Sequence, residues 1–361
     1  MKILLIQYQM LGDILTSTII ADQLKKEHPD CTIGYLIKKN GMAILEHHPS
    51  IDQLVVVEER DFNSYLRLHK LAHKLRSANY DVLIDIYGKN NSAILSKLSG
   101  IPKRIGYDKW FSSIAYTTYL KNDPEKYQYE TGSSIVSRLL LTIPLTHKVD
   151  WSLRPKIYLS NKEIEQGRAW LSNQGLDLKS KITMVSALGS SDIKTLPFKT
   201  LALIIDYYVA RTQSQLLFNY IPAQRDQAME IFSICRKETQ QFIFINSFAS
   251  SIRDFLKVLY HCNAVIGNEG GAINMAKALN VPTFSIFSPW IEKNAWNNDE
   301  DGDKNIAVHL KDKRPELFLN KTTAELKKLS LEVYEGYRMQ DVEEDLLLFI
   351  RQNNLLANRK L

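Results

Sequence analysis

The stretch that decides the fold is VIGNEGGAINMA, at residues 265–276. It predicts a short buried strand that passes through Gly270 and Gly271 directly into an apolar-faced helix. Such a junction leaves backbone N–H groups and the positive end of the helix dipole at the tip of the loop, where an anion can bind. The alternative is a glycine-rich turn used only for close packing. Packing alone poorly explains the polar pair Asn268-Glu269 before the glycines and Asn274 in the first helical turn.

The same alternation of short apolar strands and longer amphipathic helices extends outward from this stretch. Strands are expected near Lys2–Ile6, Thr32–Ile37, Leu54–Val57, Val82–Ile86 and Lys103–Gly106, and then near Ile182–Ser186, Gln215–Asn219, Phe242–Ile245, Ala264–Ile266 and Thr283–Ile286. Helices of the second series are expected near Leu201–Thr212, Gln224–Lys237, Ser251–His261 and Ala272–Leu279. This pattern is typical of βα units and predicts the α/β class, with parallel sheets covered by helices on both faces.

Two such series in 361 residues predict two lobes. A proline-containing stretch near residues 144–155 joins them, and we expect an N-terminal lobe at 1–155 and a second lobe at 156–335, with a cleft between the lobes. A helical tail is expected at 336–361, with an amphipathic helix at Val342–Ile350. Open α/β sheets bind ligands beyond the carboxyl ends of their strands, so the loops after the strands are where a site is expected.

Composition narrows the class of protein. Hydrophobic residues make up 45% of the chain and charged residues 24%, which is typical of a globular protein. Lys and Arg exceed Asp and Glu by 46 to 40, a mildly basic balance that suits an anionic ligand or a membrane surface. No apolar run reaches the ~18 residues of a spanning helix, and Asp13 interrupts any signal-peptide pattern. Three widely spaced cysteines without zinc spacing fit reduced thiols, so a cytoplasmic protein is expected.

The loop after the first strand reads QYQMLGD, at residues 7–13. It lacks the G-x-G-x-x-G pattern, which disfavours a nicotinamide-dependent oxidoreductase. Gly12 allows a tight turn, and Asp13 places a carboxylate at the start of a helix. Two interpretations remain open, because Asp is a common helix N-cap and a carboxylate here could also act as a general base toward an incoming hydroxyl.

The loop after the strand at Ile182–Ser186 reads ALGSSDIKTLP, at residues 187–197. Its small residues would let backbone N–H groups approach an oxyanion, the hydroxyl of Ser190 could add a hydrogen bond, and Lys194 supplies a positive charge for a phosphate. An ordinary solvated serine-rich loop is the alternative. The pattern does not match G-x-x-x-x-G-K-[ST].

Four segments together resemble the heptosyltransferase family, glycosyltransferase family 9. They are residues 1–13, the segment YDVLID at 80–85 with Gly88 and Ser92, the triplet Arg104-Ile105-Gly106, and residues 267–289. The resemblance extends over most of residues 1–290. It implies a GT-B architecture of two Rossmann-like lobes whose parallel sheets face a cleft. It also implies an inverting, metal-independent transfer of heptose from ADP-heptose to the inner core of lipopolysaccharide.

The resemblance also implies roles for individual residues. Asp13 matches the family's catalytic carboxylate, and Lys194 matches the lysine that contacts the donor diphosphate. In the donor loop, Glu269, Gly270, Gly271 and Asn274 stand where the family usually has Asp, Ser or Thr, Gly and His. Phosphate binding through backbone N–H groups should survive these changes, whereas the side chains that contact the donor sugar differ from the family's.

Further residues complete the expected site. Gly12 and Ser190 are expected to help bind the donor, and the acidic residue on the nucleotide side falls within Gln224-Arg225-Asp226, where we favour Asp226. Lys89 and Arg104 are expected to bind the acceptor. They belong to a basic cluster with Lys97, Lys103 and Lys109 that could meet anionic sugars or phospholipid headgroups, or simply be solvated.

No metal site is expected. His69 and His73 lie one helical turn apart without a completing carboxylate, and the run DEDGD at 299–303 lacks EF-hand spacing and is interpreted as surface. No cofactor is expected beyond the nucleotide-sugar substrate. The absence of a concentrated basic and aromatic stripe disfavours a nucleic-acid partner.

The sequence therefore predicts a cytoplasmic glycosyltransferase. Its substrates would be a nucleotide-sugar donor and a lipid-linked oligosaccharide acceptor, with peripheral contact to the inner leaflet of the membrane as a further option. One alternative is a transferase of the same fold that uses another nucleotide sugar. Another is a catalytically silent protein that binds a nucleotide sugar or a glycolipid.

Overall fold

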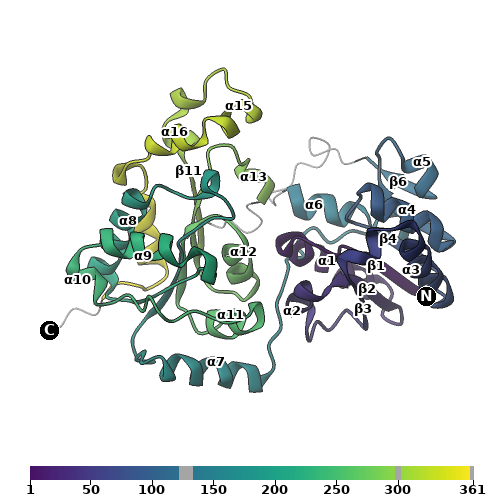
Figure 1. Ribbon diagram of the computed structural model, residues 1–361, viewed down its shortest axis with the longest axis horizontal. Helices are drawn as coiled ribbons and strands as arrows, with labels where there is room; N and C mark the ends of the chain where they lie inside the picture. The colour runs from purple at the N-terminus through teal and green to yellow at the C-terminus, as the bar shows by residue number, and fades with distance from the viewer. Residues whose placement is uncertain (122–132, 297–301, 358–361) are drawn as a thin grey trace. The chain divides into compact units, whose positions relative to one another are not determined.

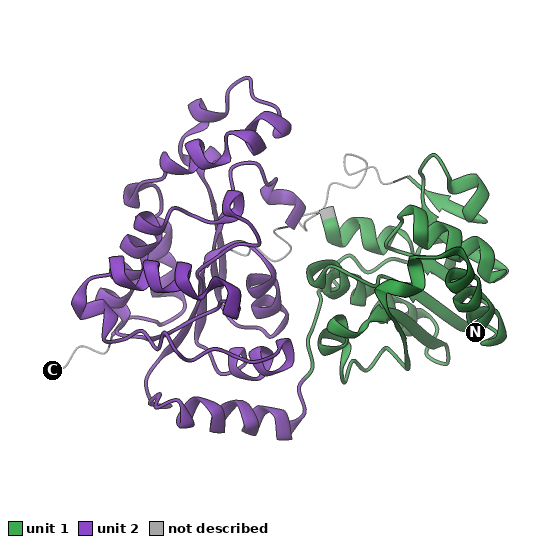
Figure 2. Cartoon of the chain, in the orientation of Figure 1, with its two compact units in different colours: residues 1–158 green, residues 159–361 purple. Residues whose placement is uncertain are grey.

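The computed structural model describes residues 1–121, 133–296 and 302–357. The chain forms two compact units, Met1–Tyr158 and Leu159–Leu361, coloured green and purple in Figure 2. Each unit is an α/β fold built on a parallel sheet (Figure 1). The acidic residues 299–301 of the run noted above lie outside the described residues.

Unit 1 contains a six-stranded sheet in the order β3-β2-β1-β4-β5-β6, with every neighbouring pair parallel. The strands are β1 (Lys2–Ile6), β2 (Thr32–Lys38), β3 (Gln53–Val57), β4 (Val82–Asp85), β5 (Lys103–Tyr107) and β6 (Thr118–Leu120). The helices are α1 (Leu11–Glu27), α2 (Met42–Leu45), α3 (Tyr65–Ser77), α4 (Asn90–Ser99), α5 (Ser112–Ala115) and α6 (Ser133–Leu140).

Helices cover both faces of the unit 1 sheet, as the apolar strands predict. Leu68, Leu71 and Leu75 of α3 and Leu95 of α4 pack with Leu4 and Leu83 of the central strands. On the other side, Ile19 of α1 packs with Ile135 and Leu139 of α6. Because β1 is buried from Ile3 onward and β4 is buried throughout, the loops that follow these central strands are held on a rigid base.

Unit 2 contains a five-stranded parallel sheet in the order β11-β10-β9-β7-β8. The strands are β7 (Ile182–Ser186), β8 (Gln215–Phe218), β9 (Ala264–Asn268), β10 (Thr283–Phe287) and β11 (Asn305–His309). The longer helices are α7 (Asn161–Asn173), α8 (Phe198–Thr212), α9 (Arg225–Ile234), α11 (Ile252–Leu259), α12 (Gly271–Ala278) and α17 (Glu343–Gln352). The short ones are α10 (Lys237–Gln240), α13 (Lys293–Trp296), α14 (Leu310–Lys313), α15 (Thr323–Lys328) and α16 (Ser330–Glu335).

One hydrophobic cluster holds unit 2 together. Residues of α8 and α9 pack with Val185, Ile266 and Ile286 from the sheet, and Leu346 and Phe349 of α17 belong to the same cluster. The C-terminal helix therefore packs into the core of unit 2.

One predicted strand is wrong. Residues 242–245 form no strand, and Ile243 makes only an isolated parallel bridge with Leu216 at the edge of the sheet. Instead, the N–H of Phe242 donates to the carbonyl of Thr239, and the N–H of Ile243 donates to the carbonyl of Gln240. These turn hydrogen bonds make the segment a loop. The short strand β6 and the strand β11 were not predicted. No helix among the described residues is long and apolar enough to cross a membrane.

Candidate active site

Asp13 is the third residue of α1 and lies just beyond the carboxyl end of β1. The N-cap of α1 is Met10, which has a left-handed φ of 66° and makes no side-chain capping hydrogen bond. The N-cap interpretation of Asp13 is therefore wrong. Its carboxylate is instead ion-paired with Arg138, whose Nη2 donates to Asp13 Oδ1 over 2.7 Å.

Arg138 comes from α6 and was not predicted as a site residue. Its side chain is 13% exposed and that of Asp13 is 25% exposed, so the pair is only partly open to solvent. Arg138 Nη1 also donates to the Tyr107 hydroxyl over 3.3 Å. Burial alone would lower the pKa of the guanidinium, but Tyr107 and Asp13 raise that pKa overall, so the arginine stays charged. Within the described residues, Asp13 Oδ2 accepts no hydrogen bond and is open to a ligand.

The pair lines a cavity of about 430 Å³ at the carboxyl edge of the unit 1 sheet. Its lining comes from the loops after β1, β4 and β5 and from α6, namely Gln7, Gln9, Met10, Asp13, Ile86, Tyr87, Lys89, Tyr107, Asp108, Lys109 and Arg138. The structure thus brings Lys89 into the same cavity as Asp13. With three cations against two carboxylates, this cavity suits a hydroxylated ligand that carries negative charge.

A buried carboxylate shapes the wall of this cavity. Asp85 is fully buried, and it accepts hydrogen bonds from the Gly88 N–H at 2.9 Å and from the Tyr116 hydroxyl at 2.8 Å. Burial raises the pKa of Asp85, and these hydrogen bonds with nearby Lys109 oppose the rise. Gly88 has a φ of +55°, a conformation that favours glycine. Asp85 therefore sets the turn that presents Lys89.

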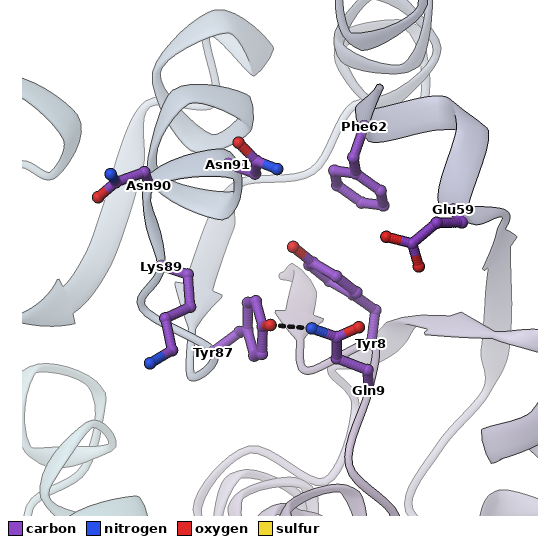
Figure 3. A pocket seen from close by; sticks show the side chains of 8 residues that line it. All are labelled: Tyr8, Gln9, Glu59, Phe62, Tyr87, Lys89, Asn90 and Asn91. Carbon is purple, nitrogen blue, oxygen red and sulfur yellow. Dashed lines mark hydrogen bonds between the residues drawn. The ribbon is translucent and has the colours of Figure 1, made fainter. Parts of the chain in front are cut away.

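A second cavity, of about 400 Å³, adjoins the first and shares Gln9, Tyr87 and Lys89 with it (Figure 3). Tyr8 stacks on Phe62 with ring centroids 4.4 Å apart and an interplanar angle of 16°. Glu59 and the amides of Asn90 and Asn91 complete the lining. Aromatic faces combined with carboxylate and amide groups match the apolar and hydroxyl surfaces of a sugar ring.

Arg104 does not join these residues. It lies on β5, where its Nε donates to Ala115 O over 2.9 Å and its Nη1 donates to Ile101 O over 2.6 Å. It lines neither of the two cavities. Its role in acceptor binding stays a prediction that these contacts do not favour.

In unit 2, residues 265–276 form the predicted strand-to-helix junction, between β9 and α12. Asn268 ends β9 and is completely buried. Its Oδ1 accepts from Leu196 N over 2.7 Å, and its Nδ2 donates to Ala187 O over 2.8 Å. The polar residue that packing did not explain therefore joins the loop at 187–196, which carries Lys194, to the glycine-rich junction.

The three glycines of this junction have different reasons to be glycine. A Cβ on Gly267, whose φ is +121°, would lie 2.5 Å from Ser186 O, so close packing requires this glycine. A Cβ on Gly270 would meet nothing within 4 Å, and one on Gly271 would meet only Met275 Cε, at 3.4 Å. The packing interpretation thus fails for Gly270 and Gly271, and the space before the helix is open to a ligand.

The predicted donor residues of unit 2 gather around this junction. Burial raises the pKa of the Glu269 carboxyl, and the nearby positive charges of Lys194 and Lys277 oppose the rise. Lys194 ends a short 3-10 helix, η4 (Asp192–Lys194), and its Nζ lies 5.3 Å from the centroid of the Trp290 ring. Ser190 is exposed in the same loop, and half-buried Asn274 lies in the first turn of α12.

Two predicted donor residues lie apart from this group. Asp226 is exposed in the first turn of α9, beyond the carboxyl end of β8. Gly12 belongs to α1 in unit 1, where a Cβ would meet no atom within 4 Å.

Comparison with solved structures establishes the class of fold. A glycosyltransferase family 9 crystal structure from Veillonella parvula matches with a TM-score of 0.75 at 18% identity, over 96% of this chain and 97% of that one. A structure of Escherichia coli heptosyltransferase WaaC with ADP matches with a TM-score of 0.66 at 15% identity, over 96% of this chain and all of that one. The fold is thus the GT-B α/β fold of glycosyltransferases.

Sequence comparison then gives the family. The model of glycosyltransferase family 9 (heptosyltransferase) matches residues 68–299, so the chain belongs to this family and is a glycosyltransferase. A curated relative, lipopolysaccharide heptosyltransferase 1 of Campylobacter coli, is 24% identical over 295 residues, which cover 80% of this chain and 84% of that protein.

Proposed function

We propose that this glycosyltransferase moves a heptose-like sugar from a nucleotide diphosphate donor, ADP-heptose, to an inner-core lipopolysaccharide acceptor with inversion at the anomeric carbon. The observation that carries the proposal is the Asp13 carboxylate in the unit 1 cavity, held at Oδ1 by Arg138. The names of the similar heptosyltransferases support the choice of sugar, and the ADP in one similar structure supports the nucleotide.

Unit 1 would bind the acceptor. In this account, a sugar ring of the acceptor lies against the aromatic cavity of Phe62 and Tyr87, and its reactive hydroxyl enters the Asp13 cavity. Lys89 would contact an anionic group of the acceptor. Because a lipid-linked acceptor is held at a bilayer, the reaction would take place at the cytoplasmic face of the inner membrane.

Unit 2 would bind the donor diphosphate. The N–H groups of Gly270 and Gly271, the N-terminus of α12 and the ammonium of Lys194 all suit a phosphate. Ser190, Glu269 and Asn274 would contact the donor from the same loops. The role of Asp226 toward the nucleotide and that of Gly12 toward the donor are parts of this proposal that rest on the resemblance alone.

The chemical step follows from these placements. Asp13 Oδ2 would accept the proton of the acceptor hydroxyl while that oxygen attacks the anomeric carbon from the face opposite the diphosphate. The bond from the anomeric carbon to the phosphate oxygen breaks, and the leaving diphosphate takes the electron pair. Lys194 and the amides would stabilise that negative charge, so the step would need no metal ion.

A transfer assay with ADP-heptose and an inner-core acceptor tests the proposal. We expect the product to have the opposite anomeric configuration to the donor, as measured by NMR coupling constants. We also expect ADP release to continue in EDTA. Retention of configuration, or loss of turnover in EDTA that Mg²⁺ restores, would contradict the mechanism.

Another nucleotide sugar is the second candidate donor, favoured by Glu269 and Asn274, which differ from the usual family residues. Calorimetry with ADP, UDP, GDP and CMP decides between the two. Selective binding of ADP that Lys194→Ala weakens supports ADP-heptose, and selective binding of UDP, GDP or CMP supports the other donor. Nucleotide binding without turnover of any donor would favour a silent binding protein.

A further inference from the structure

The two helical layers of unit 1 differ sharply in charge. On one face of the sheet, α3, α4 and α5 contain Arg67, Lys70, Lys74, Arg76 and Lys97 and not one Asp or Glu. We call the outer surface of these three helices, with the adjoining Trp110, the basic face. On the other face, α1 mixes three acidic residues with two lysines.

The basic face also exposes large apolar side chains. Trp110 is 83% exposed, Leu66 75% and Ile114 64%, and exposed Tyr65 and Ile94 lie on α3 and α4. The three helices form one surface, because α3 and α4 share a hydrophobic cluster and Ala93 of α4 packs with Phe111 and Ala115 at α5. Figure 1 shows α3, α4 and α5 within unit 1.

Contacts beneath this surface hold its parts together. The Trp110 ring makes an edge contact with the ring of buried Phe111, with centroids 5.3 Å apart. Arg76 ties α3 to α4 by donating from Nη2 to Leu98 O over 2.7 Å. The alternation on α4 is regular, since Ala93, Leu95 and Ser96 are buried while Ile94 and Lys97 are exposed.

We propose that the basic face docks on a bilayer that contains anionic lipids. The three helices carry lysines and arginines and no carboxylate; acidic residues adjoin them at Glu58, Glu59 and Asp61 in the turn before α3 and at Asp108 before Trp110. Such a cluster of lysines and arginines attracts anionic headgroups, and exposed Trp, Tyr, Leu and Ile side chains insert at the interface between headgroups and acyl chains. A second protein copy lacks this charge complementarity, because the basic face would repel its own image. The basic face is continuous with the aromatic cavity, which Asn90 and Asn91 of α4 line at the start of that helix.

The experiment is flotation of the whole chain with vesicles, which needs no turnover and so is independent of the proposed substrates. The vesicles contain phosphatidylcholine alone or with about one third phosphatidylglycerol. We expect binding only to the anionic vesicles. Raising the salt from about 0.1 M to about 1 M shortens the screening length and should release the protein.

Two double variants test the two components of the surface. Lys70→Glu with Lys97→Glu should weaken binding by about tenfold or more, since each charge near the bilayer contributes. Leu66→Ser with Trp110→Ser should weaken it by about tenfold and leave the salt dependence in place. All four side chains are exposed, so the melting temperature of each variant should match that of the wild type.

The matched controls lie in unit 2. Lys162→Glu with Lys237→Glu makes the same charge change, and Leu331→Ser with Leu348→Ser removes exposed apolar side chains from α16 and α17. Both controls should bind vesicles as the wild type does. The proposal is overturned if the controls lose as much vesicle binding as the test variants, or if neither test variant loses any. It is also overturned if the test variants bind vesicles normally and instead change the oligomeric state measured by sedimentation, because the basic face would then contact another protein copy.

Discussion

The two candidate sites differ in whether side chains or backbone groups form them. In unit 1, the site consists of side chains that come from distant segments, with Asp13 on α1 paired to Arg138 on α6. In unit 2, the site consists mainly of backbone, where β9 turns through Gly270 and Gly271 into α12. This difference suits the two sites to different tasks. Side chains can move a proton, whereas a cradle of amides can bind a phosphate but has no base.

Apart from Asp13 itself, the residue whose substitution should separate the two sites most is Arg138. Arg138→Ala should lower kcat of transfer by about a hundredfold, because the carboxylate that it orients at 2.7 Å would no longer be held in a reactive position. The binding of ADP to unit 2 should remain unchanged within about twofold, as calorimetry would show.

Arg154→Ala is the matched control. Arg154 is another arginine of unit 1, and its Nη1 donates to Trp151 O and Leu153 O. Its removal should leave kcat near the wild-type value. Equal losses of kcat in the two variants would mean that Arg138 has only a structural role.

The next effect concerns two glycines of the β9–α12 junction, four residues apart, where the same substitution should affect stability at one position and nucleotide binding at the other. Gly267→Ala should destabilise the protein by more than about 2 kcal/mol, because its Cβ meets Ser186 O at 2.5 Å. Gly271→Ala should leave the melting temperature unchanged and weaken ADP binding by about tenfold, because its Cβ would occupy the space before the helix. Normal ADP binding by a folded Gly271→Ala variant would exclude phosphate binding there.

A smaller effect concerns the pH dependence of unit 2. Burial raises the pKa of Glu269, so the folded chain holds this proton more tightly than the unfolded chain does. The stabilisation is therefore complete below the unfolded pKa and is lost as the pH rises through the higher folded pKa. Glu269→Gln keeps a neutral side chain, so its melting temperature should exceed that of the wild type at pH 8, and the difference should shrink toward about pH 4. If the difference in melting temperature between the variant and the wild type grew as the pH fell, a raised pKa of Glu269 would be contradicted.

The smallest effect is expected at Met10, the strained residue beside Asp13. Its φ of 66° is costly for a residue with a Cβ, by about 1 kcal/mol. Met10→Gly should relieve this strain and raise the melting temperature by about 1–3 °C. Met10→Ala keeps the strain and should not raise it. Equal melting temperatures for the two variants would show that the turn holds no strain.

The difference between a side-chain site and a backbone site also explains how much of each could be predicted from the sequence. A backbone site is encoded in one continuous stretch of sequence. The strand, the glycines and the helix at residues 265–276 could therefore be predicted, and so could the loop that carries Lys194. The contact between Asp13 and Arg138 joins positions 125 residues apart, and nothing in the spacing around Arg138 marks it. The strand predicted at 242–245 was wrong because the segment pairs with the edge strand β8 only around Leu216, while the N–H groups of Phe242 and Ile243 bond back to Thr239 and Gln240 in turns. Tertiary context thus overrides the strand propensity of Phe and Ile.

Buried polar residues lie between these two cases. Asn268 was recognisable as unusual, but the groups that it joins, Leu196 N and Ala187 O, follow only from the fold. Likewise, Arg104 looked like a ligand for an anion, whereas its guanidinium bonds the carbonyls of Ala115 and Ile101. A charge in a sequence shows that a partner is needed and does not identify the partner.

The central claim is that unit 2 binds the donor nucleotide and that Asp13 in unit 1 performs the proton transfer. Asp13→Asn tests it most directly, by calorimetry with ADP and by single-turnover transfer from ADP-heptose on the same sample. The account predicts ADP affinity within about twofold of the wild type and transfer slower by about 10³-fold or more, since a general base contributes on this order. Transfer at the wild-type rate, or loss of ADP binding together with transfer, would contradict it.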